Sequence, residues 1–483
     1  MKRIWAGLIL ITALTVFGGC GGSSRGLSRK NPVTLSVWHY YNGPQKASFD
    51  ALVKEFNDTL GLEKGIIVEA FSQGSVNDLM RKINESINRN VGSDDVPDIF
   101  AAYADTAYQA YGKGLTVDFS QYLSKDELHE YIDSYIEEGR FGSDGGYYLF
   151  PIAKSTEVLV VNKTAWDSFR AATGVSEAEL KTWEGITRLG KLYYQWTDGL
   201  TPEPNDGKAF FGRDAFANYM IIGSMQLGRE LFLISGDGTV RFNIDRDVMR
   251  RLWDNYYIPY VQGHFLASGR FRSDDMRTGD IIAFVGSTSG AAYLSTEVTR
   301  RDGSSYPIAI KSFALPNFEN TPAYAVQQGA GMVITKSDET REYGAVLFLR
   351  WLTEAKKNTA FSIDTGYLPV KKAANTVDNI KEAIAESETA ISPILDDILT
   401  IAVTMTGSYE LYTSKAFPNG LNIRNFVENS LYRKARQDRA AVLDSVGSGK
   451  SPAEAAAAYI NDENFEEWLR EFSDGLENLK NQE

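Results

Sequence analysis

Cysteine, histidine and the common catalytic motifs are nearly absent from this chain of 483 residues. Cys20 is the only cysteine, so no disulfide can form within the chain. Three histidines and no cysteine cluster leave too few ligands for a transition-metal site, and we expect no metal and no cofactor. No G-x-S-x-G elbow, P-loop or H-E-x-x-H motif occurs, and acidic pairs such as Asp94-Asp95 are adjacent in the chain, which is typical of loops. We therefore predict a protein that is not an enzyme.

Positive charges are outnumbered by negative ones, 50 to 63, and long apolar runs are scarce. The net charge is −13, and it becomes −15 if Lys2 and Arg3 are removed with a leader, which argues against nucleic acid or anionic lipid as a partner. The uncharged run from Ile4 to Phe17 has about 14 residues, whereas a membrane-spanning helix needs about 20. Such a run behind two basic residues predicts a secretory signal that is cleaved off.

The end of that run carries a specific motif. Phe17-Gly18-Gly19-Cys20 resembles the lipobox of bacterial lipoproteins, although Phe17 stands where leucine is usual. The resemblance implies that residues 1–20 are a signal peptide and that Cys20 carries a lipid. Residues 21–32 are rich in glycine and serine, which predicts a flexible tether. We expect an extracytoplasmic protein anchored to the cell membrane by its N-terminal lipid.

Strands and helices alternate after the tether. Residues 34–38 alternate between apolar and polar side chains as in a strand, and residues 66–71 and 97–100 are predicted as two further strands. Apolar residues recur with helical spacing between these segments. Gly61 is predicted to end the first helix, and Ser75 to cap the second. This order predicts a parallel sheet with helices on both faces and a ligand site at the carboxyl ends of the strands.

The second half of the chain repeats this mixture of elements. Residues 281–285, 308–315 and 323–335 are strand-rich, and a long helix is predicted from Ser337 onward. The acidic C-terminal 40 residues predict a packed pair of surface helices.

Several segments carry a family pattern, in order along nearly the whole chain: V-P-D-I-F-A-A-Y-A-D (96–105), F-P-I-A-K-S-T-E-V-L-V-V-N-K (150–163), M-R-T-G-D-I-I-A-F-V-G-S-T-S-G-A (276–291), Q-Q-G-A-G-M-V-I (327–334) and D-T-G-Y-L-P-V (364–370). They resemble the extracellular solute-binding proteins of bacterial ABC importers. The resemblance is to the sugar-binding class, which includes maltose-binding and glycerol-3-phosphate-binding proteins.

The resemblance implies an α/β fold of two lobes, each a central sheet flanked by helices, with three hinge crossings between them. The N-terminal lobe would contain residues 33–152 and 326–362, and the C-terminal lobe residues 153–325 and 363–483. We expect a monomer that closes on a ligand between the lobes and is read by ABC permease subunits in the membrane.

A carbohydrate site needs aromatic rings for the C–H faces of the sugar and short polar groups for its hydroxyls. Trp38, Tyr40 and Tyr41 lie at the end of the first strand and suit the aromatic role, although such residues are more often core. By resemblance Asp105 accepts hydrogen bonds from hydroxyls; alternatively, it caps the helix that follows. Gln73 either contacts the ligand or closes a loop.

The other candidates come from the resembling segments. Ser155 matches a ligand-side position at the first crossing, where maltose-binding relatives use a carboxylate. Ser287 and Thr288 either bind the ligand or cap a helix. Gly329 allows close approach of a ligand or flexibility of a hinge. Tyr367 lies on the third crossing and by resemblance reaches the ligand in phosphate-ester-binding relatives.

Arg424 is either a partner for a phosphate or carboxylate or a surface arginine, and serine instead of a carboxylate at Ser155 leaves the ligand class open. We predict a protein that captures a carbohydrate, in particular an oligosaccharide, and delivers it to an ABC permease. One alternative is a glycerol-3-phosphate or glycerophosphodiester binding protein. Another is a glycan-binding receptor or adhesin that is not coupled to transport.

Overall fold

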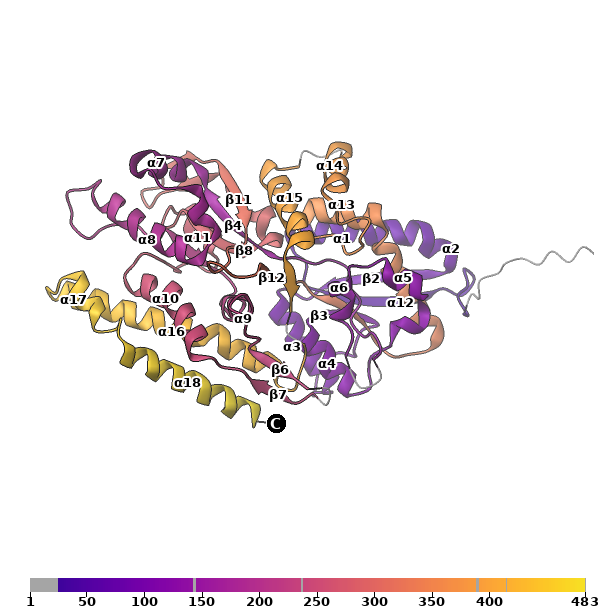
Figure 1. The fold of residues 1–483 in the computed structure, drawn as a ribbon. Helices are drawn as coiled ribbons and strands as arrows, with labels where there is room; N and C mark the ends of the chain where they lie inside the picture. The colour runs from indigo at the N-terminus through magenta and orange to yellow at the C-terminus, as the bar shows by residue number, and fades with distance from the viewer. Residues whose placement is uncertain (1–24, 142–144, 236–237, 388–390, 414, 483) are drawn as a thin grey trace, which may run out of the picture.

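The computed structural model describes residues 25–141, 145–235, 238–387, 391–413 and 415–482. Within them the chain folds into two lobes, each built around a four-stranded sheet, and Figure 1 shows the lobes next to each other with helices around the sheets. No helix in these ranges is long and apolar enough to cross a membrane. The predicted signal peptide, Cys20 and the start of the predicted tether lie outside the described residues.

The first lobe is built on strands β1 (Val33–His39), β2 (Ile66–Ser72), β3 (Ile99–Ala102) and β13 (Gly331–Ile334). Their order in the sheet is β13-β3-β1-β2. The parallel pairing of β1 with β2 and β3 is confirmed, whereas β13 returns from far along the chain and is antiparallel to β3. Leu35 and Val37 extend from β1 into the core and are fully buried.

The helices of the first lobe are α1 (Gly43–Phe56), α3 (Val76–Ile87), α4 (Ala104–Gly112), α12 (Glu339–Leu352) and α13 (Ala355–Thr365). The predicted cap of α3 is confirmed, because Ser75 and Asp78 form a reciprocal capping box. The predicted helix end at Gly61 is wrong. The helix continues through a π-helical turn (Asn57–Gly61) and α2 (Leu62–Lys64) to Gly65, whose φ of 77° is the left-handed conformation that ends helices.

The second lobe is built on strands β4 (Glu157–Asn162), β5 (Phe211–Arg213), β8 (Ala283–Ser287) and β11 (Ile310–Ala314), in the order β11-β4-β8-β5. β4 is antiparallel to both neighbours, and β5 is parallel to β8. Its longer helices are α7 (Lys163–Thr173), α8 (Trp183–Asp198), α9 (Phe216–Gln226), α10 (Arg246–Val261), α15 (Pro393–Ser408), α16 (Gly420–Gly447) and α18 (Asp462–Lys480).

Short elements complete the two lobes. The short helices are α5 (Lys125–His129), α6 (Asp133–Glu137), α11 (Arg272–Arg277), α14 (Val377–Glu386) and α17 (Pro452–Ala457). Three segments are 3-10 helical: Phe119–Tyr122, Glu177–Lys181 and Thr288–Tyr293. The short strands are β6 (Phe232–Ile234), β7 (Val240–Phe242), β9 (Glu297–Thr299), β10 (Ser305–Pro307), β12 (Tyr324–Val326) and β14 (Glu410–Tyr412).

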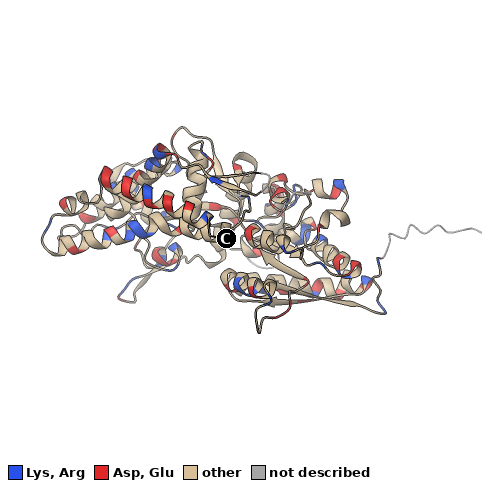
Figure 2. Ribbon diagram, turned by 90° about the horizontal axis from the view of Figure 1, so that it is seen from below, with Lys and Arg blue, Asp and Glu red and all other residues tan. Residues whose placement is uncertain are grey.

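The C-terminal residues form the predicted surface helices α17 and α18, both of which pack on α16 or its neighbours. Phe465, Trp468, Phe472 and Leu476 recur at helical spacing along α18 and are buried. Figure 2 shows acidic and basic residues interspersed along the outer helices.

Three chain segments run alongside one another where the two lobes meet. Lys154 pairs with Leu368, and Ser155 pairs with Gln328, each through backbone hydrogen bonds. The strand-rich segment predicted at residues 323–335 is therefore two strands: β12, which precedes this meeting point, and β13, which follows it in the sheet of the first lobe.

Residues 25–32, the described part of the predicted tether, lie against the first lobe. The guanidinium of Arg25 lies 4.6 Å from the ring centre of Tyr122 and 5.1 Å from that of Tyr343. Thr340 Oγ1 donates to the backbone oxygen of Arg25 at 2.9 Å, and Leu27 packs on the core. Residues 25–28 of the predicted tether are therefore held against the lobe, whereas residues 29–32 are exposed.

Candidate functional site

Two adjoining cavities lie between the lobes. Their volumes are about 650 and 800 Å³, within the range of small-molecule sites. Ala215 and Gln328 line both cavities, and we refer to these two residues as the junction. The first cavity lies between α3 and α4 of one lobe and α9 and α16 of the other. The second lies between residues that follow β1 and residues that follow β8.

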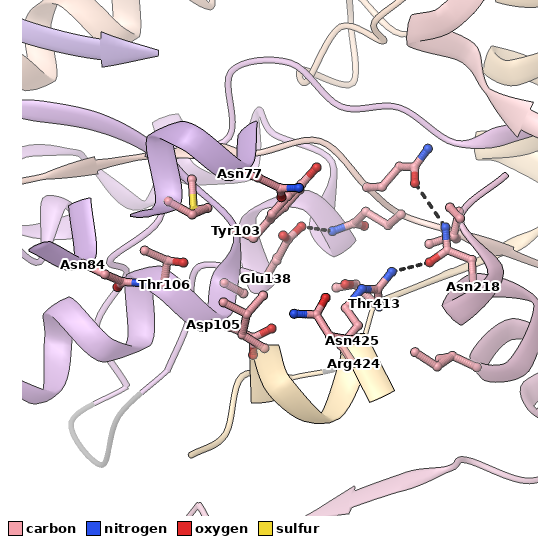
Figure 3. A pocket seen from close by; sticks show the side chains of 18 of the residues that line it. Asn77, Asn84, Tyr103, Asp105, Thr106, Glu138, Asn218, Thr413, Arg424 and Asn425 are labelled. Carbon is pink, nitrogen blue, oxygen red and sulfur yellow. Dashed lines mark hydrogen bonds between the residues drawn. The ribbon is translucent and has the colours of Figure 1, made fainter. Parts of the chain in front are cut away.

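Side-chain amides are prominent in the polar lining of the first cavity (Figure 3). They come from α3 and the residues after it, from α9 and α16, and from the segment before β13: Asn77, Asn84, Asn88, Asn90, Asn218, Asn425, Gln327 and Gln328. An amide both donates and accepts hydrogen bonds, so it can bind a hydroxyl in either orientation. Tyr103 adds an aromatic ring to this cavity.

A buried network of Glu157, Arg213 and Asn218 connects two of these amides, Asn218 and Gln328, to a buried ion pair. Glu157 begins β4 and Arg213 ends β5, at the same edge of the sheet. Arg213 Nη2 donates to Glu157 Oε2 at 2.5 Å, and the two side chains are 1% and 0% exposed. Asn218 Nδ2 donates to Glu157 Oε1 at 2.7 Å and to Gln328 Oε1 at 3.2 Å, and Arg424 donates to Asn218 Oδ1.

A second buried ion pair ties the first lobe to the segments where the lobes meet. Lys154 Nζ donates to Glu138 Oε2 at 2.5 Å and to the backbone oxygen of Gly329 at 2.9 Å. Gln327 Nε2 donates to the same carboxylate oxygen at 2.6 Å. Glu138 lines the first cavity, so this pair fixes one wall of it.

Asp105 lies in the first turn of α4 and approaches Arg424 across the first cavity (Figure 3). No side chain caps α4, so the alternative prediction that Asp105 is the helix cap is wrong. Burial raises the pKa of Asp105 to about 6; Arg424 opposes this shift and Glu138 adds to it.

We expect Asp105→Asn to increase the free energy of unfolding at pH 7–8. Because the pKa of this carboxyl rises from 3.8 to about 6 on folding, the folded state binds more protons between these values, and stability falls as the pH rises through them. Removing the charge should therefore stabilise the protein by about 1–3 kcal/mol above pH 6 and by little at pH 4.

Urea denaturation at several pH values measures this effect. Asp302→Asn is the control, because hydrogen bonds from Ser304 lower the pKa of that exposed carboxyl, and its removal should not stabilise at any pH. An Asp105→Asn protein no more stable than the parent at pH 8 would show that burial of this charge costs nothing.

Aromatic rings line the second cavity. The hydroxyls of Tyr40 and Tyr367 are 3.2 Å apart, and Phe271 and Tyr293 are about half exposed, at 51% and 53%. Tyr293 Oη donates to the backbone oxygen of Asn42 at 3.3 Å, which joins the two lobes at the edge of the cavity. These rings offer flat apolar surfaces beside polar hydroxyls.

Most charged groups in the second cavity have partners within the protein, whereas Arg270 is exposed and lies over the ring of Phe271. Arg272 pairs with Asp275 and contacts Asp214 at 3.4 Å. Burial raises the pKa of Asp214 to about 6, and Arg272 opposes the shift. Glu428 accepts from the backbone N–H groups of Phe216 and Ala217 at the start of α9. This pairing favours a neutral ligand over a charged one.

Five of the residues predicted to bind a ligand line these cavities. Asp105 and Arg424 lie in the first, and Tyr40, Ser287 and Tyr367 in the second. The alternative prediction that Ser287 caps a helix is confirmed, because its Oγ accepts from the backbone N–H of Ser289.

Two predicted aromatic residues and one polar residue lie elsewhere in the first lobe. Trp38 and Tyr41 are buried in its core, at 8% and 1% exposure. Trp38 lies on β1, an inner strand of the sheet, and Tyr41 packs against Phe49 and Phe361. Gln73 accepts from Lys82 Nζ at 2.6 Å, and its backbone N–H donates to His39, so it closes the loop after β2. None of the three lines either cavity.

Three more predicted residues support the backbone where the lobes meet, and none of them lines either cavity. Ser155 is buried and pairs with Gln328 through its backbone. Thr288 is fully buried, and its backbone N–H donates to Thr156. Gly329 has a φ of 98° and approaches the backbone of residues 153–155, so its close approach is to the neighbouring chain segment.

Sequence reasoning missed Gln328, Asn218 and Arg213. A signal existed for Asn218, since it is a polar residue in the otherwise apolar start of α9, and a buried polar side chain needs a partner. Gln328 stands next to the predicted Gly329, but nothing local distinguishes it from Gln327.

Many solved structures share this fold. The structure of UgpB from Mycobacterium tuberculosis in complex with glycerophosphocholine is 19% identical, with a TM-score of 0.64 over 92% of this chain and 99% of that chain. An ABC substrate-binding protein from Listeria monocytogenes in complex with cycloalternan is 14% identical, with a TM-score of 0.64 over 92% and 100%. The cyclic α-maltosyl-1,6-maltose binding protein from Arthrobacter globiformis is 16% identical, with a TM-score of 0.61 over 91% and 100%. At these identities the likeness shows the fold alone.

Sequence comparison identifies the family. A search of curated proteins finds no match to the chain. The family model described as bacterial extracellular solute-binding protein matches residues 51–387, which is more than half of the chain. The chain therefore belongs to the family of bacterial extracellular solute-binding proteins.

Proposed function

We propose that the chain captures a carbohydrate, of the size of an oligosaccharide, between its lobes and delivers it to the permease of an ABC importer. One observation carries the ligand class: aromatic rings line one cavity and side-chain amides line the adjoining one. The cleft thus combines surfaces for the C–H faces of a sugar with partners for its hydroxyls. The similar Listeria structure in complex with cycloalternan and the similar Arthrobacter cyclic α-maltosyl-1,6-maltose binding protein support this choice.

We propose that the lobes consist of residues 33–152 with 326–362 and of residues 153–325 with 363–483. The three segments where they meet would act as hinges. Gln45 Nε2 donates to the backbone oxygen of Ser289 at 3.2 Å, so the two lobes contact each other directly beside the second cavity. A ligand that contacts both lobes stabilises their closed arrangement by its higher affinity for that state, and permease subunits would recognise this arrangement.

Membership of an extracellular family makes the protein extracytoplasmic. We propose that Cys20 attaches it to the cell membrane through a lipid, as the F-G-G-C motif implies. The attachment is tested by cell fractionation, in which Cys20→Ser should move the protein out of the membrane fraction.

A glycerophosphodiester is the second candidate ligand. Arg424 lines the first cavity, and the similar UgpB structure contains glycerophosphocholine. However, Arg424 already donates a hydrogen bond to Asn218, and the carboxylate of Asp105 lies across from it. The negative charge of Asp105 offsets the positive charge of Arg424, so the attraction for a phosphate is weak. We therefore rank a neutral carbohydrate first.

Ligand-dependent thermal unfolding of residues 25–483 tests the proposal. We expect one class of mono- or oligosaccharide to raise the melting temperature by a few degrees, because ligand at a hundredfold its Kd adds about 2.7 kcal/mol. The sugar should be recovered unchanged. Glycerol-3-phosphate and glycerophosphocholine form the second arm.

Asp105→Ala should weaken sugar binding about tenfold or more, since a hydroxyl loses its half-buried acceptor. Asp302→Ala, at an exposed turn, is the matched control and should bind as the parent does. A shift with the phosphate esters alone would establish the second candidate. No shift with any of these compounds, after removal of co-purified ligand, would exclude both.

A further inference from the structure

We propose that Gln328 is the central hydrogen-bond donor to the ligand and that the buried network orients it. The proposal rests on the carbohydrate function given above. Gln328 lies at the junction and lines both cavities, so a ligand that extends from one cavity into the other passes this side chain. Its backbone exchanges hydrogen bonds with Ser155 at 2.8 and 3.0 Å, which fixes the position of its Cα atom where the lobes meet.

Hydrogen-bond chemistry determines how Asn218 is oriented. Glu157 accepts with both carboxylate oxygens, one from Arg213 and the other from Asn218, so the amide nitrogen of Asn218 must face Glu157. The amide oxygen then faces Arg424, which can only donate. Asn218 is 1% exposed. If its amide were reversed, the oxygen would face the carboxylate of Glu157 and the nitrogen would face the guanidinium of Arg424, and neither buried contact could form a hydrogen bond.

The orientation of Asn218 in turn determines that of Gln328. Asn218 Nδ2 donates to Gln328 Oε1 at 3.2 Å, so the amide oxygen of Gln328 is engaged by the network. Its Nε2 is directed elsewhere and has no hydrogen-bond acceptor among the residues that the structure describes. The side chain is half-buried and borders both cavities, which leaves this nitrogen as a donor available to a ligand.

This arrangement gives the buried ion pair a role in recognition. A buried ion pair is weak evidence for stability, because desolvation of the charges offsets their attraction. Here the pair holds one amide, and that amide holds a second one at the junction. A ligand must then present an acceptor to Gln328, and the hydroxyl, ring and glycosidic oxygens of a sugar all accept.

Affinities across oligosaccharide series test the proposal by calorimetry on the full chain without its leader. The probes are gluco-oligosaccharides with α-1,4, α-1,6 or β-1,4 links and xylo-oligosaccharides, each from one to six rings. We expect affinity to rise about tenfold or more at the length that reaches both cavities. Gln328→Glu keeps the acceptor for Asn218 and removes the donor, and it should abolish most of this rise. Gln195→Glu, exposed on α8, is the matched control and should keep it.

The outcomes separate this inference from the function on which it rests. Sugar binding with an affinity independent of length, or unchanged in Gln328→Glu, would overturn the role of Gln328 and leave the carbohydrate function intact. Binding of none of the four series would overturn both.

The orienting role of the network has its own readout. If Asn218 acts through Gln328, Asn218→Ala should weaken binding of the longer sugars about fivefold or more in the parent and by less than twofold in the Gln328→Glu background. A purely structural role predicts equal effects in the two backgrounds, and equal effects would overturn the assignment of Asn218 as a positioning residue.

Discussion

Glu157→Ala should lower the free energy of unfolding of the second lobe by about 3–5 kcal/mol. The change leaves the guanidinium of Arg213 buried without a counter-charge, and that group lies between the rings of Trp183 and Tyr219, at 5.3 and 5.7 Å from their centres. It also removes the acceptor of Asn218. Urea denaturation followed by circular dichroism, at pH 7 and without ligand, gives the difference.

Two further variants identify the cause of this loss. Asp167→Ala breaks the exposed pair with Lys163, whose side chains are 45% and 52% exposed for the lysine and the aspartate, and should cost less than about 1 kcal/mol. Glu157→Leu combined with Arg213→Met removes both buried charges and should recover a large part of the stability. A Glu157→Ala protein within 1 kcal/mol of the parent would show that Arg213 does not depend on Glu157.

The sequence was sufficient for most of the fold because its local signals agree with the tertiary structure. The capping box at Ser75 and the alternation around β1 and β2 are confirmed. Gly61 shows the limit of such signals, because a glycine is compatible with a right-handed turn and the next one, Gly65, adopts the conformation that ends the helix. Residues 323–335 were predicted as one strand-rich segment but form two strands, β12 and β13. Nothing in the composition of the segment marks where the chain passes from one lobe to the other.

The site residues that directly follow a strand could be predicted from the sequence. The residues that depend on hydrogen bonds between distant parts of the chain could not. Tyr40 and Asp105 follow β1 and β3, and both line cavities. Trp38 stands two residues before Tyr40, but it still belongs to the strand and is therefore buried. The side chain of Gln328 is oriented by a hydrogen bond from Asn218, 110 residues earlier in the chain, and no local sequence pattern predicts that contact.

Gly329→Ala should lower the free energy of unfolding by about 2–4 kcal/mol. The φ of Gly329 is 98°, a conformation that a residue with a Cβ atom adopts only with strain. An added Cβ atom would also lie 2.8 Å from the backbone oxygen of Ala153 and 3.2 Å from Lys154 Cα. Neither atom can move alone, because Lys154 and Ser155 are paired with Leu368 and Gln328. Thermal and urea unfolding measure the loss.

Gly303→Ala separates the two contributions to this cost. Gly303 has a similar φ of 83°, but no atom lies within 4 Å of the Cβ position, so the variant should show the conformational strain alone, about 1 kcal/mol. The excess cost at Gly329 then measures how tightly the three segments are packed where the lobes meet. An equal loss in free energy of unfolding at the two glycines would mean that the three segments shift easily to accommodate a Cβ atom. Backbone packing at this place would then offer little resistance to lobe closure.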